Sequence, residues 1–194
     1  MSILGKHGIS ATTPENILLG AGTWHRNLQW DVDSQKWTGD ILGATQGGGK
    51  ISIAGEFVPL EVDGALVKVK GLVVKQGGTV TAEVNFAELS PEVMQMATLF
   101  ENATSDVTGF TMLKDKPQIN EGDYVENFGF VGYTANNAKQ IIFIMENALC
   151  TSGMELEAKP KEQAVVKLTM EAYANNEGDL DTLPVKIYYP STAA

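Results

Sequence analysis

The sequence is poor in the side chains that most often carry chemistry. It has one cysteine, Cys150, and two histidines, His7 and His25, among 194 residues. A lone cysteine excludes an internal disulfide and a thiolate metal cluster, and its apolar surroundings, IIFIMENALC, favour a buried core position. Neither histidine has a nucleophile motif or a second metal ligand beside it. We therefore expect no enzyme activity, no cofactor and no metal site.

Basic residues are scarce as well. The chain has 14 Lys and Arg against 24 Asp and Glu, which gives a formal net charge of −10. Tight binding to nucleic acid depends on clustered cations, so the charge argues against it but lets nucleic acid pass without adhering. No apolar run approaches the 18 residues of a membrane span, and no signal-peptide pattern is present. We expect synthesis in the cytoplasm and no membrane partner.

Alternation with period two is the dominant pattern, and it predicts strands with one apolar face. The residues that repeat in this way are Ile51, Ile53 and Phe57; Val80, Ala82, Val84 and Phe86; and Val166, Leu168, Met170 and Ala172. Ile141 to Met145 is apolar throughout, which predicts cover on both faces by the protein's own core and by a helix or another subunit. Turn dipeptides at Asp63-Gly64 and Asn136-Asn137 predict hairpins.

One helix is predicted over about residues 91–103. Ser90 is a good N-cap, Pro91 suits the first helical position, and apolar residues recur behind them at helical spacing. The chain is therefore expected to form a single domain, 1–194, of mainly β class: a two-sheet β-sandwich or barrel with one helix. Residues 1–14 are predicted to be a flexible arm, and residues 29–50 a polar, glycine-rich insert or loop.

Two motifs invite a chemical interpretation, and both fail. The segment GATQGGGK at 43–50 resembles a phosphate loop, but Ala44 stands where glycine is required and Ile51 where Ser or Thr is required. Asp31 and Asp33 begin like a calcium loop, yet Lys36 holds the place of the turn glycine. The glycines of 43–50 are therefore better explained as a joint between strands.

The order of these segments resembles the tail tube proteins of long-tailed bacteriophages and related prophages. The resemblance rests on a short N-terminal arm, ENILLGAGTW, LGATQGGGK, EVDGALVKVKG, GTVTAEVNFAELSPE, and the C-terminal KEQAVVKLTMEAYANNEGDLDTLPVKIYYP. It implies a tail tube fold whose copies form hexameric rings, stacked into a tube in the virion tail and assembled in the host cytoplasm. It also implies tape measure and tail tip or terminator proteins as partners. Type VI secretion tube proteins are similar.

In such a tube, DNA would pass through an acidic lumen without specific binding. The candidate lumen residues are Glu56, Glu83 and Glu171. The candidate joints between subunits are Gly43, Gly47, Gly48, Gly49, Asp63 and Gly64.

Other interpretations remain open. The chain could be the tube protein of a contractile tail, a tail-like bacteriocin or a secretion particle, or it could be a head decoration or tail terminator protein. A monomeric β-sandwich that binds carbohydrate or another ligand is the alternative from a different class. That alternative depends on Trp24, Trp30 and Trp37, which lie close together in the sequence.

Overall fold

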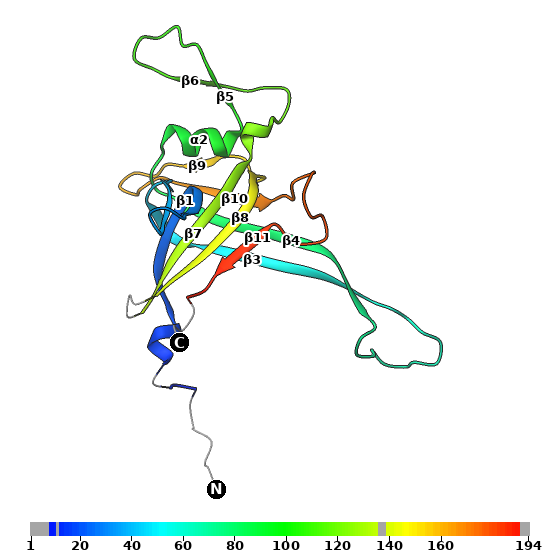
Figure 1. Ribbon diagram of the computed structural model, residues 1–194. Coiled ribbons are helices and arrows are strands. Elements are labelled where there is room, and N and C mark those ends of the chain that lie inside the picture. Colours follow the sequence, from blue (N-terminus) through cyan, green and yellow to red (C-terminus); the bar gives the residue numbers. More distant parts are fainter. Residues whose placement is uncertain (1–7, 11, 136–138, 191–194) are drawn as a thin grey trace.

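The fold is mainly β, as the sequence predicts. The computed structural model describes residues 8–10, 12–135 and 139–190 (Figure 1), with 51% of the chain in strands and 8% in helices. The elements, in chain order, are α1 (Thr13–Asn16), β1 (Leu18–Asp31), β2 (Lys36–Ile41), β3 (Thr45–Pro59), β4 (Val73–Phe86), α2 (Pro91–Thr98), β5 (Glu101–Ala103), β6 (Met112–Lys114), the 3-10 helix η1 (Glu121–Asp123), β7 (Val125–Thr134), β8 (Gln140–Cys150), β9 (Glu155–Glu157), β10 (Val165–Ala172) and β11 (Val185–Tyr188).

Most strands belong to one antiparallel sheet. Its order is β2-β1-β7-β8-β10-β4-β3, with β11 paired to β8 and β9 paired to β10, while β5 and β6 form a small separate ribbon. The hairpin predicted around Asn136-Asn137 is confirmed and is long, because β7 and β8 pair from Val125↔Ala148 to Tyr133↔Gln140. Its Asn136-Asn137 turn lies outside the described residues.

The sheet curls until its two ends meet, which gives the sandwich or barrel character. The β1–β2 pairing continues one residue past β2, where Leu42 donates its backbone N–H to the carbonyl of Trp24 at 3.0 Å, and β1 then lies close to β3. The indole of Trp24 also lies against Gly49 of β3, where an added Cβ would stand 2.7 Å from the ring. Glycine at position 49 therefore lets β3 pack closely against Trp24 of β1.

The main core fills the interior of this curl. Trp24 is 1% exposed and stacks on Phe128, with ring centroids 5.2 Å apart. The alternating residues predicted for β4 and β10 point into this core, and α2 covers one end of it (Figure 1). Its other buried members are Leu42, Val80, Ala82, Val84, Phe86, Val93, Met96, Ala97, Val125, Phe130, Met145, Ala148, Cys150, Val166, Leu168 and Met170.

A second, smaller cluster covers the opposite face of β7 and β8. Ile142 and Ile144 belong to it, together with Leu28 and Val131, and Trp37 packs against it. Cover on both faces of Ile141 to Met145 is thus confirmed. On the second face the cover comes from the same chain and is not a helix, because Leu28 and Trp37 belong to the β1–β2 hairpin. Just before Leu28 the register of β1 shifts, and Asn27 adopts a positive φ of 54° there.

The helix begins where predicted and ends earlier. Ser90 Oγ accepts the backbone N–H of Val93 at 3.1 Å, which is the expected N-cap. The end predicted near residue 103 is wrong, because Leu99 adopts a left-handed C-cap conformation at φ 59° and residues 101–103 form β5. The predicted end lies too far along the chain because the helical spacing of apolar residues continues past α2: Leu99 packs on the core although the backbone has already left the helix.

Two expected loops have more structure than the sequence suggested. Residues 29–50, expected as a polar insert, contain the end of β1, all of β2 and the start of β3. Of the expected arm 1–14, residues 1–7 and 11 lie outside the described residues. Its last part enters α1, where Glu15 pairs with Lys139 at 3.3 Å and Asn16 accepts a hydrogen bond from Tyr189 at 2.8 Å.

Candidate assembly surfaces and pockets

The most exposed apolar segment is the end of the β3–β4 hairpin, residues 57–75. We call this segment the arm; it is distinct from the N-terminal arm expected over residues 1–14. It extends beyond the core as a long ribbon that ends in an irregular loop, residues 60–72 (Figure 1). Leu66 is 99% exposed, Val67 78% and Phe57 64%. Large apolar side chains in this number on one projection are typical of a surface that binds another protein.

The arm also corrects two expectations. Asp63-Gly64 does turn the chain, with the Ala65 N–H donating to Val62 at 3.1 Å, but the flanking residues 60–72 form no strands and the hairpin pairs β3 with β4. Ile53 and Phe57, expected on a half-buried strand face, are exposed. Alternation shows that side chains share a face, but it does not show that the same chain covers that face.

The candidate lumen residues lie in two places. Glu83 and Glu171 share the polar outer face of β4 and β10, because Glu83 pairs with Thr169 and Glu171 with Thr81. Glu83 contacts Lys50 at 3.2 Å and Lys167 at 3.1 Å. Hydrogen bonds from Lys167, and then from Lys50, hold the pKa of Glu83 below its ordinary value. Glu56 is exposed at the register shift between Gly55 and Phe57.

The candidate joints fall into two groups. Gly43, Gly47, Gly48 and Gly49 lie at the start of β3, within the fold, where Thr45 to Gly49 forms a bulge against β4. Asp63 and Gly64 lie at the turn in the arm loop, where Gly64 has a φ of 88°. The structure therefore brings together the first four and places the last two far along the arm.

The three tryptophans do not form one aromatic binding surface. Trp24 is core, whereas Trp30 and Trp37 meet edge to face at 5.5 Å, and Trp37 meets Tyr188 at 4.7 Å. Tyr133 and Tyr189 join them around an open groove of about 740 Å³. The sequence indicated the two tryptophans but not the tyrosines, which come from distant strands.

A second groove was not predicted at all. It lies where β7 begins and β10 ends, has a volume of about 380 Å³, and is defined by Glu121, Tyr124, Glu126, Asn147 and residues 173–176; we call it the tyrosine groove. The rings of Tyr124 and Tyr173 meet edge to face at 5.8 Å. Burial, and then the charge of Glu171, raises the pKa of Tyr173. These residues come from separate elements with no shared motif, so no sequence signal joined them.

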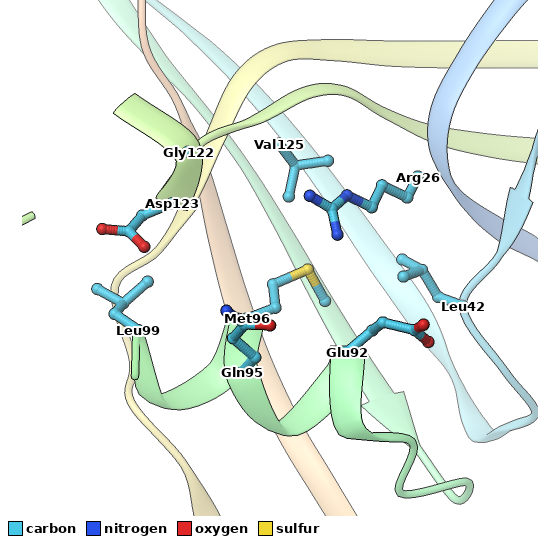
Figure 2. Close-up of a pocket in the computed structure, with 9 residues that line it drawn as sticks. All are labelled: Arg26, Leu42, Glu92, Gln95, Met96, Leu99, Gly122, Asp123 and Val125. Carbon is cyan, nitrogen blue, oxygen red and sulfur yellow. The ribbon is translucent and has the colours of Figure 1, made fainter. Parts of the chain in front are cut away.

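A small cavity, partly open to solvent, lies between α2 and η1. Figure 2 shows the guanidinium of Arg26 between Val125 and Met96, with Glu92 on one side and Asp123 on the other. The cavity is about 50 Å³, which is room for roughly three water molecules at about 15 Å³ each. Within the described chain, Arg26 Nε is buried without a hydrogen-bond partner. The space suits ordered water beside the buried Nε of the half-buried Arg26, and it is too small for a substrate.

Asp123 also fixes the loop that leads to η1. It pairs with Lys116, and both side chains are under one tenth exposed. Such a buried pair is costly to break from one side, because the remaining charge loses its partner. The loop after the β5–β6 ribbon is thus tied to the same end of the core as α2.

His25 shows no catalytic arrangement among the described residues. Its Nε2 lies 2.9 Å from Thr23 Oγ1, and burial lowers the pKa of the imidazole. Cys150 is buried, as expected, whereas His7 lies outside the described residues. Across residues 8–10, 12–135 and 139–190, no group of three or more His, Cys, Asp or Glu is placed to hold a metal ion. In the same ranges, no helix is long and apolar enough to cross a membrane.

Comparison with known proteins adds no family. No protein-family model matches the chain, and no curated protein matches it.

Proposed function

We propose that the chain is a structural protein that polymerises through its own surfaces as stacked hexameric rings, forming the tail tube of a phage or prophage particle. DNA would pass along the tube without specific binding, and tape measure and terminator proteins would be its partners in the virion tail. The resemblance in segment order supports the tube, and the −10 charge of each chain agrees with a lumen that does not retain DNA.

The arm is the observation that carries the proposal. A monomer gains nothing from holding Phe57, Leu66 and Val67 in water, whereas a neighbouring copy could bury all three. Along the arm, the outer edge of β3 pairs with no strand that the structure describes, and natural proteins protect such edges by pairing or by cover. A single contact between copies would bury the apolar side chains and pair the backbone groups of β3.

The test is assembly of the purified protein over a range of concentrations. We expect light scattering after size exclusion to show growing oligomers, and negative-stain electron microscopy to show hollow tubes of uniform width. A variant in which a short turn replaces residues 60–72 should keep its circular dichroism spectrum and lose assembly. A wild-type protein that stays monomeric at every concentration would overturn the proposal.

A monomeric ligand-binding module is the second candidate, because the groove beside Trp30, Trp37 and Tyr188 exposes aromatic rings. Oligosaccharides commonly stack on such rings. Tryptophan fluorescence during titration with a panel of neutral oligosaccharides separates the two functions. Saturable quenching that disappears in Trp30→Ala, in a protein that never assembles, would favour the module.

A further inference from the structure

We propose that the tyrosine groove of one copy binds the lysine-bearing arm loop of another copy, so that the contact runs head to tail. The inference rests on the proposed self-assembly and specifies which two surfaces meet. The donor is the segment Val67-Lys68-Val69-Lys70, and the acceptor surrounds Tyr124 and Tyr173.

The acceptor has the chemistry of a site for a cationic side chain. Tyr124 and Tyr173 present two ring surfaces at an interplanar angle of 80°, and Glu121 and Glu126 stand exposed beside them. Neither carboxylate forms an ion pair with any residue that the structure describes. Aromatic rings attract an ammonium group over their faces, and adjacent carboxylates add a counter-charge.

The groove is also preorganised. Asn147 Nδ2 donates to the Tyr173 carbonyl at 3.2 Å, and the Tyr173 N–H donates to the Glu146 carbonyl at 3.3 Å. These bonds hold the chain after β10 against β8 beside Asn147, which adopts a φ of 45°. A wall held in this way loses little conformational freedom when a partner binds.

The donor has the complementary pattern. Lys68 and Lys70 alternate with Val67 and Val69, and all four side chains are exposed. Within the described residues, neither lysine forms an ion pair. In an extended segment the lysines would lie on one side and the valines on the other, so the lysines could enter the groove while the valines pack at its rim.

The positions of donor and acceptor exclude a contact within one chain. The groove lies where β7 begins and β10 ends, close to α2, whereas the arm loop projects well away from this end of the molecule (Figure 1). A contact between two different patches is heterologous: one copy of the pair keeps a free acceptor and the other keeps a free donor. Such a contact can add further copies, either around a ring or along a stack, instead of closing a pair.

A charge exchange tests the contact. We expect Lys68→Glu with Lys70→Glu, and separately Glu121→Lys with Glu126→Lys, each to raise the protein concentration needed for assembly by about tenfold or more. Combining all four substitutions should restore assembly, because opposite charges face each other again. Lys114→Glu with Lys161→Glu changes the net charge equally, outside the proposed contact, and should assemble like wild type at matched ionic strength.

Sedimentation and negative-stain microscopy give the readout, and circular dichroism checks folding of each variant. Recovery in the four-substitution variant supports the contact and excludes misfolding as the cause of the loss. If wild type assembles and both charge reversals assemble equally well, the contact is wrong while the proposed function stands. If the four-substitution variant assembles no better than either reversal, the pairing is also overturned. A strictly monomeric wild type would overturn both proposals.

Discussion

Gly49 is the residue on which closure of the sheet depends most directly. Its φ is not in the left-handed region, so the need for glycine comes from space: an added Cβ would stand 2.7 Å from the Trp24 ring and 3.0 Å from the Glu83 carbonyl. We expect Gly49→Ala to lower the free energy of unfolding by about 1–3 kcal/mol through overpacking. Urea titration followed by tryptophan fluorescence measures this change.

Gly122 supplies the control for that substitution. An alanine Cβ there would meet nothing within 4 Å and the φ is unexceptional, so Gly122→Ala should change the same free energy by no more than about 0.5 kcal/mol. Equal effects at the two positions would mean that Trp24 can move aside without cost. In that case the approach of β1 to β3 is looser than the structure indicates.

Glu83 carries the second prediction at this scale. Replacing Lys167 and Lys50 with methionine removes the hydrogen bonds that lower its pKa, so the pKa should rise toward its ordinary value of 4.5. Carbon-detected NMR of the carboxyl group follows the titration. Lys159→Met, which removes only the partner of Glu157, should leave Glu83 unchanged. An unchanged Glu83 pKa in the double variant would show that solvent screens both lysines.

The sign of the linked pH effect follows from that direction. A carboxyl group whose folded-state pKa is lowered stabilises the fold above its unfolded pKa, and that contribution is lost as pH falls through the folded value. Wild type should therefore lose more stability than the double methionine variant as pH falls below about 4.5. Because the Glu83 side chain is 35% exposed, the difference will be small and reduced by salt.

At the residue scale, the sequence identified the buried members of β4 and β10 correctly. Val84 and Leu168 alternate with polar neighbours, and period-two burial needs no knowledge of the rest of the chain. The partners of Glu83 could not be predicted in the same way. Lys50 and Lys167 come from strands on either side of β4, so their approach depends on sheet order and register.

At the scale of elements, the start of the helix α2 is encoded more locally in the sequence than its end. The helix α2 begins where Ser90 and Pro91 predict, because capping involves only the first turn. Its end at Leu99 lacks the glycine that usually marks a left-handed C-cap, so no local signal announced it. The same limit applies to the arm: apolar alternation in β3 predicted a strand, but the exposure of its apolar side chains depends on where the rest of the chain folds.

The cap itself gives a prediction for this scale. Ser90→Ala removes the acceptor for the Val93 N–H and should lower the free energy of unfolding by about 1 kcal/mol. Ser90→Asp keeps an acceptor and adds a favourable charge at the helix N-terminus, so it should remain close to wild type. Thermal unfolding by circular dichroism distinguishes the two variants. A similar loss in both would mean that the serine acts through packing, without the cap bond.

At the scale of the whole molecule, net charge matters through its placement. A ring of six copies would carry about −60, six times the −10 of one chain. The candidate lumen residues do not share that charge equally, because Glu83 stands between two lysines while Glu56 has no ion pair in the described part of the chain. Glu56 and Glu171 are therefore the residues to test for repulsion of DNA.

Replacing Glu56 and Glu171 with lysine should leave tubes intact and make them retain DNA. Each subunit gains four units of positive charge, about 24 per six-copy ring, which converts repulsion into attraction if these side chains line the lumen. We expect short duplex DNA to co-sediment with the variant tubes at low salt and to be released as salt rises, because phosphate contacts weaken with ionic strength. Glu101→Lys with Asp106→Lys makes the same charge change on exposed residues in and beside the separate β5–β6 ribbon, away from this face. If both tubes retain DNA equally, the effect comes from net charge alone, and neither Glu56 nor Glu171 faces the channel.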